Sequence, residues 1–372
     1  MKKVLLTGMG HQLGGTESFI DTLIDNNKDN IEWAILSATN DTVVKESHWN
    51  AFNIPVYKLK NIFGLKNALR RSKIFSEFLR GHNFDVLHIN ATTLNTVYMA
   101  RAALKQGVSV VYQVHNTAPS GYSYFEKLLT SINKNIARYY LLKHPEIQLV
   151  SVSDEAAEKV FGTELAKKVK VIVNGISTDK YCFDDRERTQ MRVSLELKEN
   201  DYVGIVVARL MPIKNIQWLI SIMANANQNV LQKLLIVGEG PERENLSALI
   251  KENGLQEKVV LLGEQKDVQK FLFAADLFLL TSYSEGLSIS VIEAQASGLP
   301  VLVSEGIPKV TNITGQVFFM GLDQTEEKWI KEIQRIKQEH LIWNRVDSNN
   351  MVEKSEFSKE RFRREILRLY GV

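Results

Sequence analysis

The stretch DLFLLTSYSEGLSISVIEAQASGLPVLVS, residues 276–304, contains a complete strand–turn–helix–strand pattern. In chain order, its parts predict a buried strand, a turn, a helix and a second buried strand: 276–282, 283–288, 289–297 and 299–304. Two buried strands joined by a helix predict a parallel pair with a crossover connection. The stretch also carries two carboxylates, Glu285 in the predicted turn and Glu293 in the predicted helix.

The same alternation of apolar runs and helical patterns continues along the chain in both directions. The other expected strands are 3–8, 32–37, 85–90, 108–114, 147–153, 202–208, 233–238, 258–263 and 316–320. Near-continuous apolar strands separated by helices predict parallel sheets that are covered on both faces. Two such series predict an α/β protein with two doubly wound domains. A ligand is then expected at the carboxyl ends of the strands, in the cleft between the domains.

The length of 372 residues also favours two domains. The break is expected near VNGISTDKY, residues 173–181. We therefore assign an N-terminal domain to residues 1–177, a C-terminal domain to 178–354, and a separate terminal helix to 355–372. The helix pattern alone leaves open whether this last segment packs on the second domain or crosses back to the first.

Composition excludes several classes of protein. The net charge is only +3, which gives no reason to expect nucleic acid as a partner. The single cysteine, Cys182, excludes a disulfide framework and a cysteine-rich zinc site, and it fits a reducing cytosol. The start MKKVLLTG has an apolar run too short for a signal peptide and is better interpreted as a first strand. We expect a cytoplasmic protein.

A glycine-rich loop, GMGHQLGGTE at residues 8–17, lies between the first predicted strand and helix. Leu13 stands where the dinucleotide-binding fingerprint requires a third glycine, so that motif is not matched. The pair Gly14–Gly15 directly before a helix N-terminus favours an anion or sugar site. A plain tight turn is the alternative.

Two cations follow a buried strand in VVARLMPIKN, residues 206–215. Arg209 stands at the carboxyl end of the strand, and Lys214 stands in or near the first turn of the next helix, where a positive charge opposes the helix dipole. The pair favours a bound dianion over the alternative of two solvated surface charges. A second turn, at Gly238–Glu239–Gly240, follows the next strand, and a third places Asp267 as the expected N-cap before Val268.

The two carboxylates of the opening stretch are expected to hold different parts of one extended ligand. Glu285 lies in the turn, and Ser288 or Ser290 is expected to cap the helix that follows. Glu293 then lies about one turn into that helix, roughly 4–8 Å further along its axis. An exposed turn residue and a solvated helix face are the alternatives, but Glu293 is embedded among small and apolar residues, which favours a buried or cleft position.

Two histidines end strands of the first domain, His88 in DVLHIN and His115 in YQVHNT. Either is compatible with a core histidine. His115 precedes a polar loop and is the better candidate for a functional role. The sequence contains no Asp-x-Asp pair to cradle a metal–diphosphate, so a diphosphate leaving group is expected to be neutralised by Arg209, Lys214 and helix N-termini, without a metal or other cofactor.

These segments, taken in order, resemble the retaining glycosyltransferases of family 4, the group 1 type with the GT-B fold. The matching parts are GGTE, His115, ARLMPIKN, VGEGPE, GEQKDV and the E-x7-E pattern from Glu285 to Glu293 followed by AQASGLPV. The resemblance covers nearly the whole chain and is closest to bacterial members that build capsule, exopolysaccharide or cell-wall glycans. It implies that the terminal helix returns to the N-terminal domain.

The resemblance also implies roles for individual residues. Arg209 and Lys214 would bind the diphosphate of a nucleotide sugar, and Glu293 would bind the ribose hydroxyls. The donor sugar and phosphate would be held by Glu285 and by the amides of the three residues that follow it: Gly286, Leu287 and Ser288.

Further donor contacts are implied by the same resemblance. Gly15 would close over the phosphates, and His115 would contact the sugar near the reacting carbon. Gly238 belongs to the matched VGEGPE turn, and Val268 lies in the segment that would flank the base. The sequence departs from the family at Ala208 and Asn215, where glycine is common, and at Ser288, where glycine or proline is frequent.

The expected reaction is transfer of a hexose or N-acetylhexosamine, most simply from a UDP-linked donor, to a glycan or lipid-linked saccharide. Residues 1–180 carry a net charge of +6 and the remainder −3, and the 123–143 helix has basic residues beside apolar ones. Peripheral contact with an anionic membrane is therefore one hypothesis, and a core-facing helix with a solvated face is the alternative. A sugar-nucleotide epimerase of the same fold, or an idle partner subunit, are the alternative functions.

Overall fold

The computed structural model describes residues 1–10, 15–27, 29–37, 46–59, 62, 70–115, 124–227, 230–339 and 344–372. The chain divides into two compact units. Unit 1 consists of Met1–Gly175 together with Glu360–Val372, and unit 2 consists of Ile176–Lys359. The terminal segment thus returns to unit 1 at Glu360. The sequence alone predicts the start of this separate segment at residue 355.

Unit 1 contains, within its described residues, a seven-stranded parallel sheet in the order β3-β2-β1-β4-β5-β6-β7. Its strands are β1 (Lys2–Met9), β2 (Ile31–Ser37), β3 (Val56–Tyr57), β4 (Val86–Ala91), β5 (Ser109–Val114), β6 (Gln148–Ser151) and β7 (Lys170–Val171). Its helices are α1 (Gly15–Asp25), α2 (Glu46–Ala51), α3 (Arg71–Arg80), α4 (Val97–Leu104), α5 (Tyr124–Lys143), α6 (Asp154–Phe161), α7 (Thr163–Ala166) and α15 (Lys359–Tyr370), with a 3₁₀ turn η2 (Leu94–Thr96). The short strands β3 and β7 are additions to the five strands expected for this part of the chain.

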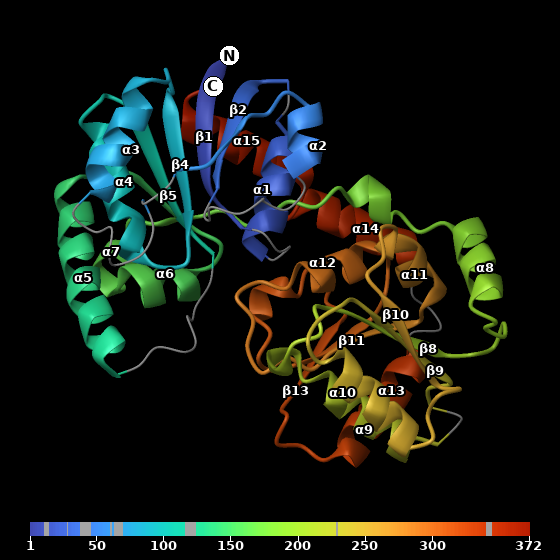
Figure 1. Ribbon diagram of the computed structural model, residues 1–372. Helices are drawn as coiled ribbons and strands as arrows, with labels where there is room; N and C mark the ends of the chain where they lie inside the picture. Colours follow the sequence, from blue (N-terminus) through green and yellow to red (C-terminus); the bar gives the residue numbers. More distant parts are fainter. Residues whose placement is uncertain are drawn as a thin grey trace. The chain divides into compact units, whose positions relative to one another are not determined.

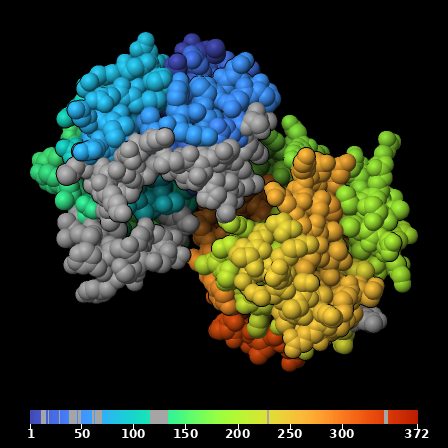
Figure 2. Space-filling model, in the orientation of Figure 1, coloured from blue at the N-terminus to red at the C-terminus, as the bar shows by residue number. Residues whose placement is uncertain are grey.

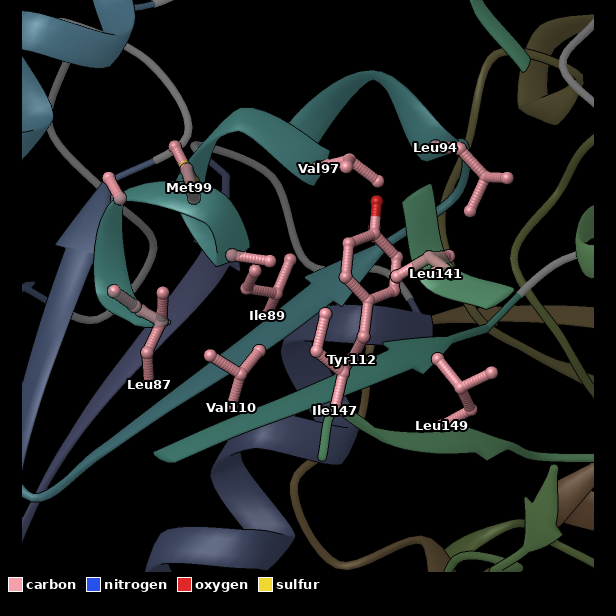
Figure 3. Packing of buried hydrophobic residues seen from close by; sticks show 14 of the residues in the cluster. Leu87, Ile89, Leu94, Val97, Met99, Val110, Tyr112, Leu141, Ile147 and Leu149 are labelled. Atoms are coloured by element: carbon pink, nitrogen blue, oxygen red, sulfur yellow. The ribbon is translucent and has the colours of Figure 1, made fainter. Parts of the chain in front are cut away.

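Helices cover both faces of this sheet (Figure 1). Because side chains alternate across a strand, Leu5 packs with α3, α4 and α5 on one face, while Val4 and Leu6 pack with α1, α2 and α15 on the other. Figure 3 shows the first face, where the ring of Tyr112 lies among leucine, isoleucine and valine side chains of β4, β5, β6 and η2–α4. Burial on both faces explains the near-continuous apolar runs that the sequence shows.

Helix α15 completes the second face of unit 1. Its side chains Phe362, Ile366 and Tyr370 are at most 2% exposed and pack in the same cluster as Phe19 and Trp33. The aromatic rings of Phe362 and Phe19 meet edge to face with their centroids 5.7 Å apart. The return of the terminal helix to the first domain, which the resemblance implied, is therefore what the structure has.

Unit 2 contains, in the part that is described, a six-stranded parallel sheet in the order β10-β9-β8-β11-β12-β13. The strands are β8 (Val203–Val207), β9 (Lys233–Val237), β10 (Val259–Gly263), β11 (Leu277–Leu280), β12 (Val301–Ser304) and β13 (Val317–Met320). The helices are α8 (Asp185–Ser194), α9 (Ile216–Asn225), α10 (Arg243–Glu252), α11 (Val268–Ala274), α12 (Ile289–Ala296), α13 (Glu326–Glu339) and α14 (Arg345–Lys354), with 3₁₀ turns η3 (Thr178–Tyr181), η4 (Pro212–Lys214) and η5 (Lys309–Thr311). In the space-filling view, the yellow surface of this unit includes α10 (Figure 2).

Asp276 connects several elements at the amino ends of the strands of this sheet. Its carboxylate accepts hydrogen bonds from Arg188 at 2.7 Å and from the amide of Val203 at 2.9 Å. Arg188 and Arg345 also donate to carbonyls at the end of α11, which are left without partners inside the helix. This cluster links α8, α11 and α14 on the opposite side of the sheet from the carboxyl ends of the strands.

Candidate functional site

Neighbouring strands β8 and β11 mark the point where the strand order of unit 2 reverses. From β8 the chain builds outward to β9 and β10, and from β11 it builds to β12 and β13 on the other side. In doubly wound sheets, ligands bind outside the carboxyl ends of the strands at such a switch point. The segments 208–216 and 281–288 follow these two strands. The amide of Tyr283 donates to the carbonyl of Ile213 at 2.9 Å, which ties the segments together.

Lys214 and Glu285 form an ion pair at this switch point. Lys214 Nζ donates to Glu285 Oε1, and the hydroxyl of Ser282 donates to the same oxygen at 2.7 Å. The side chains of the pair are 21% and 12% exposed, so the pair is largely enclosed by protein yet reachable from solvent. Ser282 is fully buried and was not identified from the sequence. The structure therefore brings together two of the expected site residues and adds a third group that orients the carboxylate.

Asn215 explains how Lys214 reaches this position. Asn215 has φ 50° and ψ 40°, a left-handed conformation that glycine adopts freely and asparagine tolerates. The turn ends η4 at Lys214, and α9 begins only at Ile216. Lys214 therefore precedes the helix, and its charge is directed to Glu285. Asparagine preserves the backbone turn at a position where the resembling family commonly has glycine.

The turn containing Gly238 packs directly against the backbone that carries Arg209. Gly238 has φ 139°, and a Cβ atom there would come within 1.9 Å of the carbonyl oxygen of Ala208. The amide of Leu210 donates to the carbonyl of Glu239 at 2.8 Å. Glycine is thus required for the two turns to lie side by side. The side chain of Arg209 is exposed at the carboxyl end of β8, on the same strand end as Lys214.

Glu293 has a different partner from Glu285. It is the fifth residue of α12, and its Oε1 accepts a hydrogen bond from the hydroxyl of Tyr181 at 2.5 Å. Although the side chain is partly exposed, burial raises the pKa of the Glu293 carboxyl, against the Tyr181 hydrogen bond and the charge of Lys180, which lower it. No signal in the sequence pointed to Tyr181, because it precedes Glu293 by 112 positions and belongs to no motif.

Ser288 does not cap α12 as expected. It occupies the N-cap position, but its hydroxyl makes no capping hydrogen bond and instead lies 3.4 Å from the hydroxyl of Ser290. Gly286 and Leu287 precede it in the loop and are partly buried. The backbone amides at the start of α12 are therefore not capped by the Ser288 side chain.

The segment around Val268 lies further from the switch point. Val268 is the first residue of α11, which follows β10, and β10 lies on the far side of β9 from β8. Asp267 stands at the N-cap position of α11 but makes no side-chain capping bond, which corrects the expected cap. Within unit 2 the expected residues thus spread along the carboxyl edge of the sheet from β10 to β11 and the start of α12.

In unit 1, His115 follows β5 and lies beside Asn90 at the end of β4. His115 Nε2 is 2.7 Å from Asn90 Oδ1, and its ring lies 4.6 Å from that of Phe19, centroid to centroid. Burial and, to a smaller extent, the neighbouring His88 lower the pKa of His115 to about 3. His115 is therefore neutral near pH 7 and acts there as a hydrogen-bonding group, not as a cation.

His88 is the core histidine of the two. It is fully buried, with Nδ1 2.5 Å from the hydroxyl of Tyr370 and Nε2 3.0 Å from Gln113 Oε1. The glycine loop begins nearby at Gly8, whose φ of 100° lets it pass the carbonyl oxygen of Asn90, which a Cβ would approach to 2.4 Å. Gly15 is the first residue of α1, whereas residues 11–14 and the polar loop 116–123 lie outside the described residues.

Across the parts of the chain that the structure describes, no group of three or more His, Cys, Asp or Glu side chains could hold a metal ion. The same residues include no helix long and apolar enough to span a bilayer. For the basic helix α5, the side chains of residues 124–132 are outside the description. Further along it, Ile136 and Tyr139 are 61% and 64% exposed.

The two Rossmann-like units, each a doubly wound parallel sheet, define the GT-B class of α/β proteins. The structure of Anabaena Alr3699/HepE in complex with UDP matches over 100% of both chains, with a TM-score of 0.80 and 19% identity. Two family models match the sequence: Glycosyltransferase Family 4 at residues 13–180, and Glycosyl transferases group 1 at residues 187–341. The chain therefore belongs to the glycosyltransferases, with a Family 4 region followed by a group 1 region.

Curated relatives agree with this assignment. N-acetyl-alpha-D-glucosaminyl L-malate synthase of Bacillus anthracis is 26% identical over 275 residues, which are 72% of this chain and 70% of the relative. The putative glycosyltransferase EpsF of Bacillus subtilis is 23% identical over 342 residues, 90% of this chain and 87% of the relative. The protein is therefore a transferase of the glycosyltransferase type.

Proposed function

We propose that this glycosyltransferase is a retaining enzyme that transfers a hexose or N-acetylhexosamine from a UDP-linked donor. The acceptor is a glycan or a lipid-linked saccharide in the assembly of capsule, exopolysaccharide or cell wall. The similar HepE was solved with UDP and with UDP-glucose, which supports the choice of donor. The similarity to EpsF over 90% of the chain supports the choice of pathway class.

The observation that carries the proposal is the set of charged groups at the β8–β11 switch point. Lys214 is held there by Glu285, and Arg209 stands at the end of the same strand. Two cations at this edge match the two negative charges of a diphosphate leaving group, whose developing charge they would stabilise during transfer. No metal or other cofactor is part of the proposal, because these cations supply the positive charge that the leaving group requires.

The remaining residues take roles around this diphosphate. Glu293, one turn into α12, binds the hydroxyls of the ribose. Glu285 and the backbone amides of its loop bind the donor sugar. Val268 flanks the base, on the β10 side of the sheet. The Gly238 turn keeps the backbone of Arg209 in place.

Two residues of unit 1 complete the set. His115, neutral near pH 7, accepts or donates a hydrogen bond to the donor sugar close to the reacting carbon. Gly15, at the start of α1, allows the backbone to approach the phosphates. We place the enzyme in the cytoplasm, with peripheral contact between the basic helix α5 and the membrane that carries its acceptor.

A donor panel tests the proposal. Purified protein is incubated with UDP-glucose, UDP-galactose, UDP-N-acetylglucosamine, GDP-mannose and ADP-glucose, and released nucleotide and new sugar products are measured. We expect UDP release from at least one UDP-sugar, and loss of that release in Lys214→Ala and Glu293→Ala. Interconversion of donors without release would indicate an epimerase, and no turnover or binding of any donor would contradict the proposal.

A further inference from the structure

Tyr181 is held rigidly against the helix that carries Glu293. The ring is 7% exposed and belongs to η3, which packs between α12 and α14. Asn349 of α14 donates from Nδ2 to the carbonyls of Thr178 and Ala296, both at 2.9 Å, and thereby ties η3 to α12. The hydroxyl of Thr178 donates to the carboxylate of Glu353. Tyr181 therefore approaches Glu293 from a fixed frame.

The segment before η3 adds to this rigidity. Ile176 is the first residue of unit 2, and its amide donates to the carbonyl of Phe357 at 2.8 Å. The amide of Lys359 donates in turn to the carbonyl of Ile176 at 3.1 Å. The chain enters and leaves unit 2 along one hydrogen-bonded strip. Tyr181 lies five positions after Ile176.

A carboxylate in the position of Glu293 needs such a donor. Burial raises its pKa, so the surroundings favour the neutral acid unless hydrogen bonds and charges stabilise the carboxylate. The groups of η3 that do so are the Tyr181 hydroxyl and the Lys180 ammonium. On α14, the nearby carboxylate of Glu353 is engaged by Thr178. Burial also raises the pKa of Tyr181 far above neutrality, so its hydroxyl remains a neutral donor.

The hydrogen bond also fixes the direction of the carboxylate. With Oε1 held by Tyr181, the carboxyl plane of Glu293 is set by a group outside its own helix. The second oxygen, Oε2, then has a defined orientation before any ligand arrives. A prearranged acceptor binds a hydroxyl group without first losing rotational freedom, which increases affinity.

We propose that Tyr181 is a positioning residue, which holds Glu293 ionised and correctly turned to accept the ribose hydroxyls of the donor nucleotide. The inference rests on the proposed role of Glu293 in donor binding. It assigns to Tyr181 a contribution to recognition of the vicinal diol that acts only through Glu293. The nucleotide class it concerns is a ribonucleoside diphosphate.

The test is a thermodynamic cycle that combines the removal of the Tyr181 hydroxyl with the removal of the ribose hydroxyls of the ligand. UDP and 2′,3′-dideoxy-UDP are titrated calorimetrically into wild-type protein and the Tyr181→Phe variant, which keeps the ring. Loss of a charge-assisted hydrogen bond predicts about 10-fold weaker binding of UDP by the variant. Binding of the dideoxy nucleotide, which offers no hydroxyls to Glu293, is expected to change by less than about 2-fold. Tyr202→Phe, at the opposite edge of the sheet, serves as the matched control and leaves both affinities unchanged.

A pH series separates this role from a purely structural one. Without the Tyr181 donor the pKa of Glu293 rises further, so the loss of UDP affinity on acidification begins at a higher pH in Tyr181→Phe than in wild type. Thermal melting confirms that both variants are folded. Equal losses for UDP and the dideoxy nucleotide, or no loss for either, would overturn the inference while leaving the donor site intact. Failure of wild-type protein to bind UDP would instead overturn the proposed function itself.

Discussion

Replacing Glu285 by glutamine is expected to tighten the binding of UDP while it abolishes most transfer. Lys214 is paired with Glu285. A diphosphate that engages Lys214 must share that cation with the carboxylate and must lie close to its negative charge. Glutamine keeps the shape of the side chain and its hydrogen bond from Ser282, but it removes the charge.

The magnitude follows from Coulomb's law. A carboxylate and a phosphate that contact the same ammonium lie about 6 Å apart, and two like charges at that separation repel by about 0.7 kcal/mol at a dielectric constant near 80 and by about 3 kcal/mol near 20. The side chains of Lys214 and Glu285 are 21% and 12% exposed, which places the site between these limits. The predicted gain in UDP affinity for Glu285→Gln is therefore about 10-fold.

Isothermal titration calorimetry with UDP at low and at high NaCl concentration measures this gain. It is expected to shrink at high salt, because mobile ions screen the repulsion. Glu305→Gln is the control: this exposed carboxylate follows the next strand, β12, and is not paired with Lys214 in the structure. UDP affinity that is unchanged or weaker in Glu285→Gln, relative to that control, would refute the idea that Glu285 and the diphosphate compete for Lys214.

Three further predictions concern the frame of the site. Asp276→Asn removes the carboxylate that pairs with Arg188, so it should lower the free energy of unfolding by about 3–5 kcal/mol in a urea titration while the folded protein keeps its UDP affinity. An unchanged urea midpoint would show that the Asp276–Arg188 pair does not stabilise unit 2. The pKa of His88 is lowered by burial to about 4 and that of His115 to about 3, both from 6.5, so the unfolded chain binds protons at a higher pH than the folded protein, and the free energy of unfolding should fall by about 2–5 kcal/mol as the pH drops from 7 to 4.5. His88→Gln should lose less of this free energy over the same pH range, and an equal loss in the variant and the wild type would show that His88 does not cause the pH dependence. Asn215→Gly should leave stability and UDP affinity nearly unchanged, whereas Asn215→Val should lower the free energy of thermal unfolding by about 1–2 kcal/mol, because a β-branched residue disfavours φ 50°. Equal stability of the two variants would show that the left-handed backbone at this turn does not disfavour valine.

The doubly wound architecture could be predicted because its strands are buried on both faces, which leaves continuous apolar runs. The two-residue strands β3 and β7 carry too few residues to form such a pattern. Ser288, which was expected with Ser290 as the alternative, and Asp267 do occupy N-cap positions, but neither side chain makes a capping hydrogen bond. A suitable residue type at the right position does not fix the rotamer that such a bond needs.

The site was predicted to the extent that its residues follow strand ends. Parallel strands bring such residues to one edge, so Lys214 and Glu285 could be expected near one another before their ion pair was seen. Tyr181 and Ser282 could not be found in this way, because each acts through a single contact to a carboxylate that no residue spacing in the sequence reveals. The polar loop after His115 was the sequence signal that favoured it over His88, and the structure shows that His88 is enclosed between Tyr370 and Gln113.

The central claim is that a UDP-sugar binds at the carboxyl edge of unit 2, over the β8–β11 switch point. Hydrogen–deuterium exchange of the backbone amides, with and without saturating UDP-glucose, tests it most directly. The account predicts slower exchange in residues 209–216 and 283–293, and no such slowing in Lys214→Ala at the same ligand concentration. Unchanged exchange in both segments under conditions where calorimetry shows binding, or protection confined to the Asp276 edge, would contradict it.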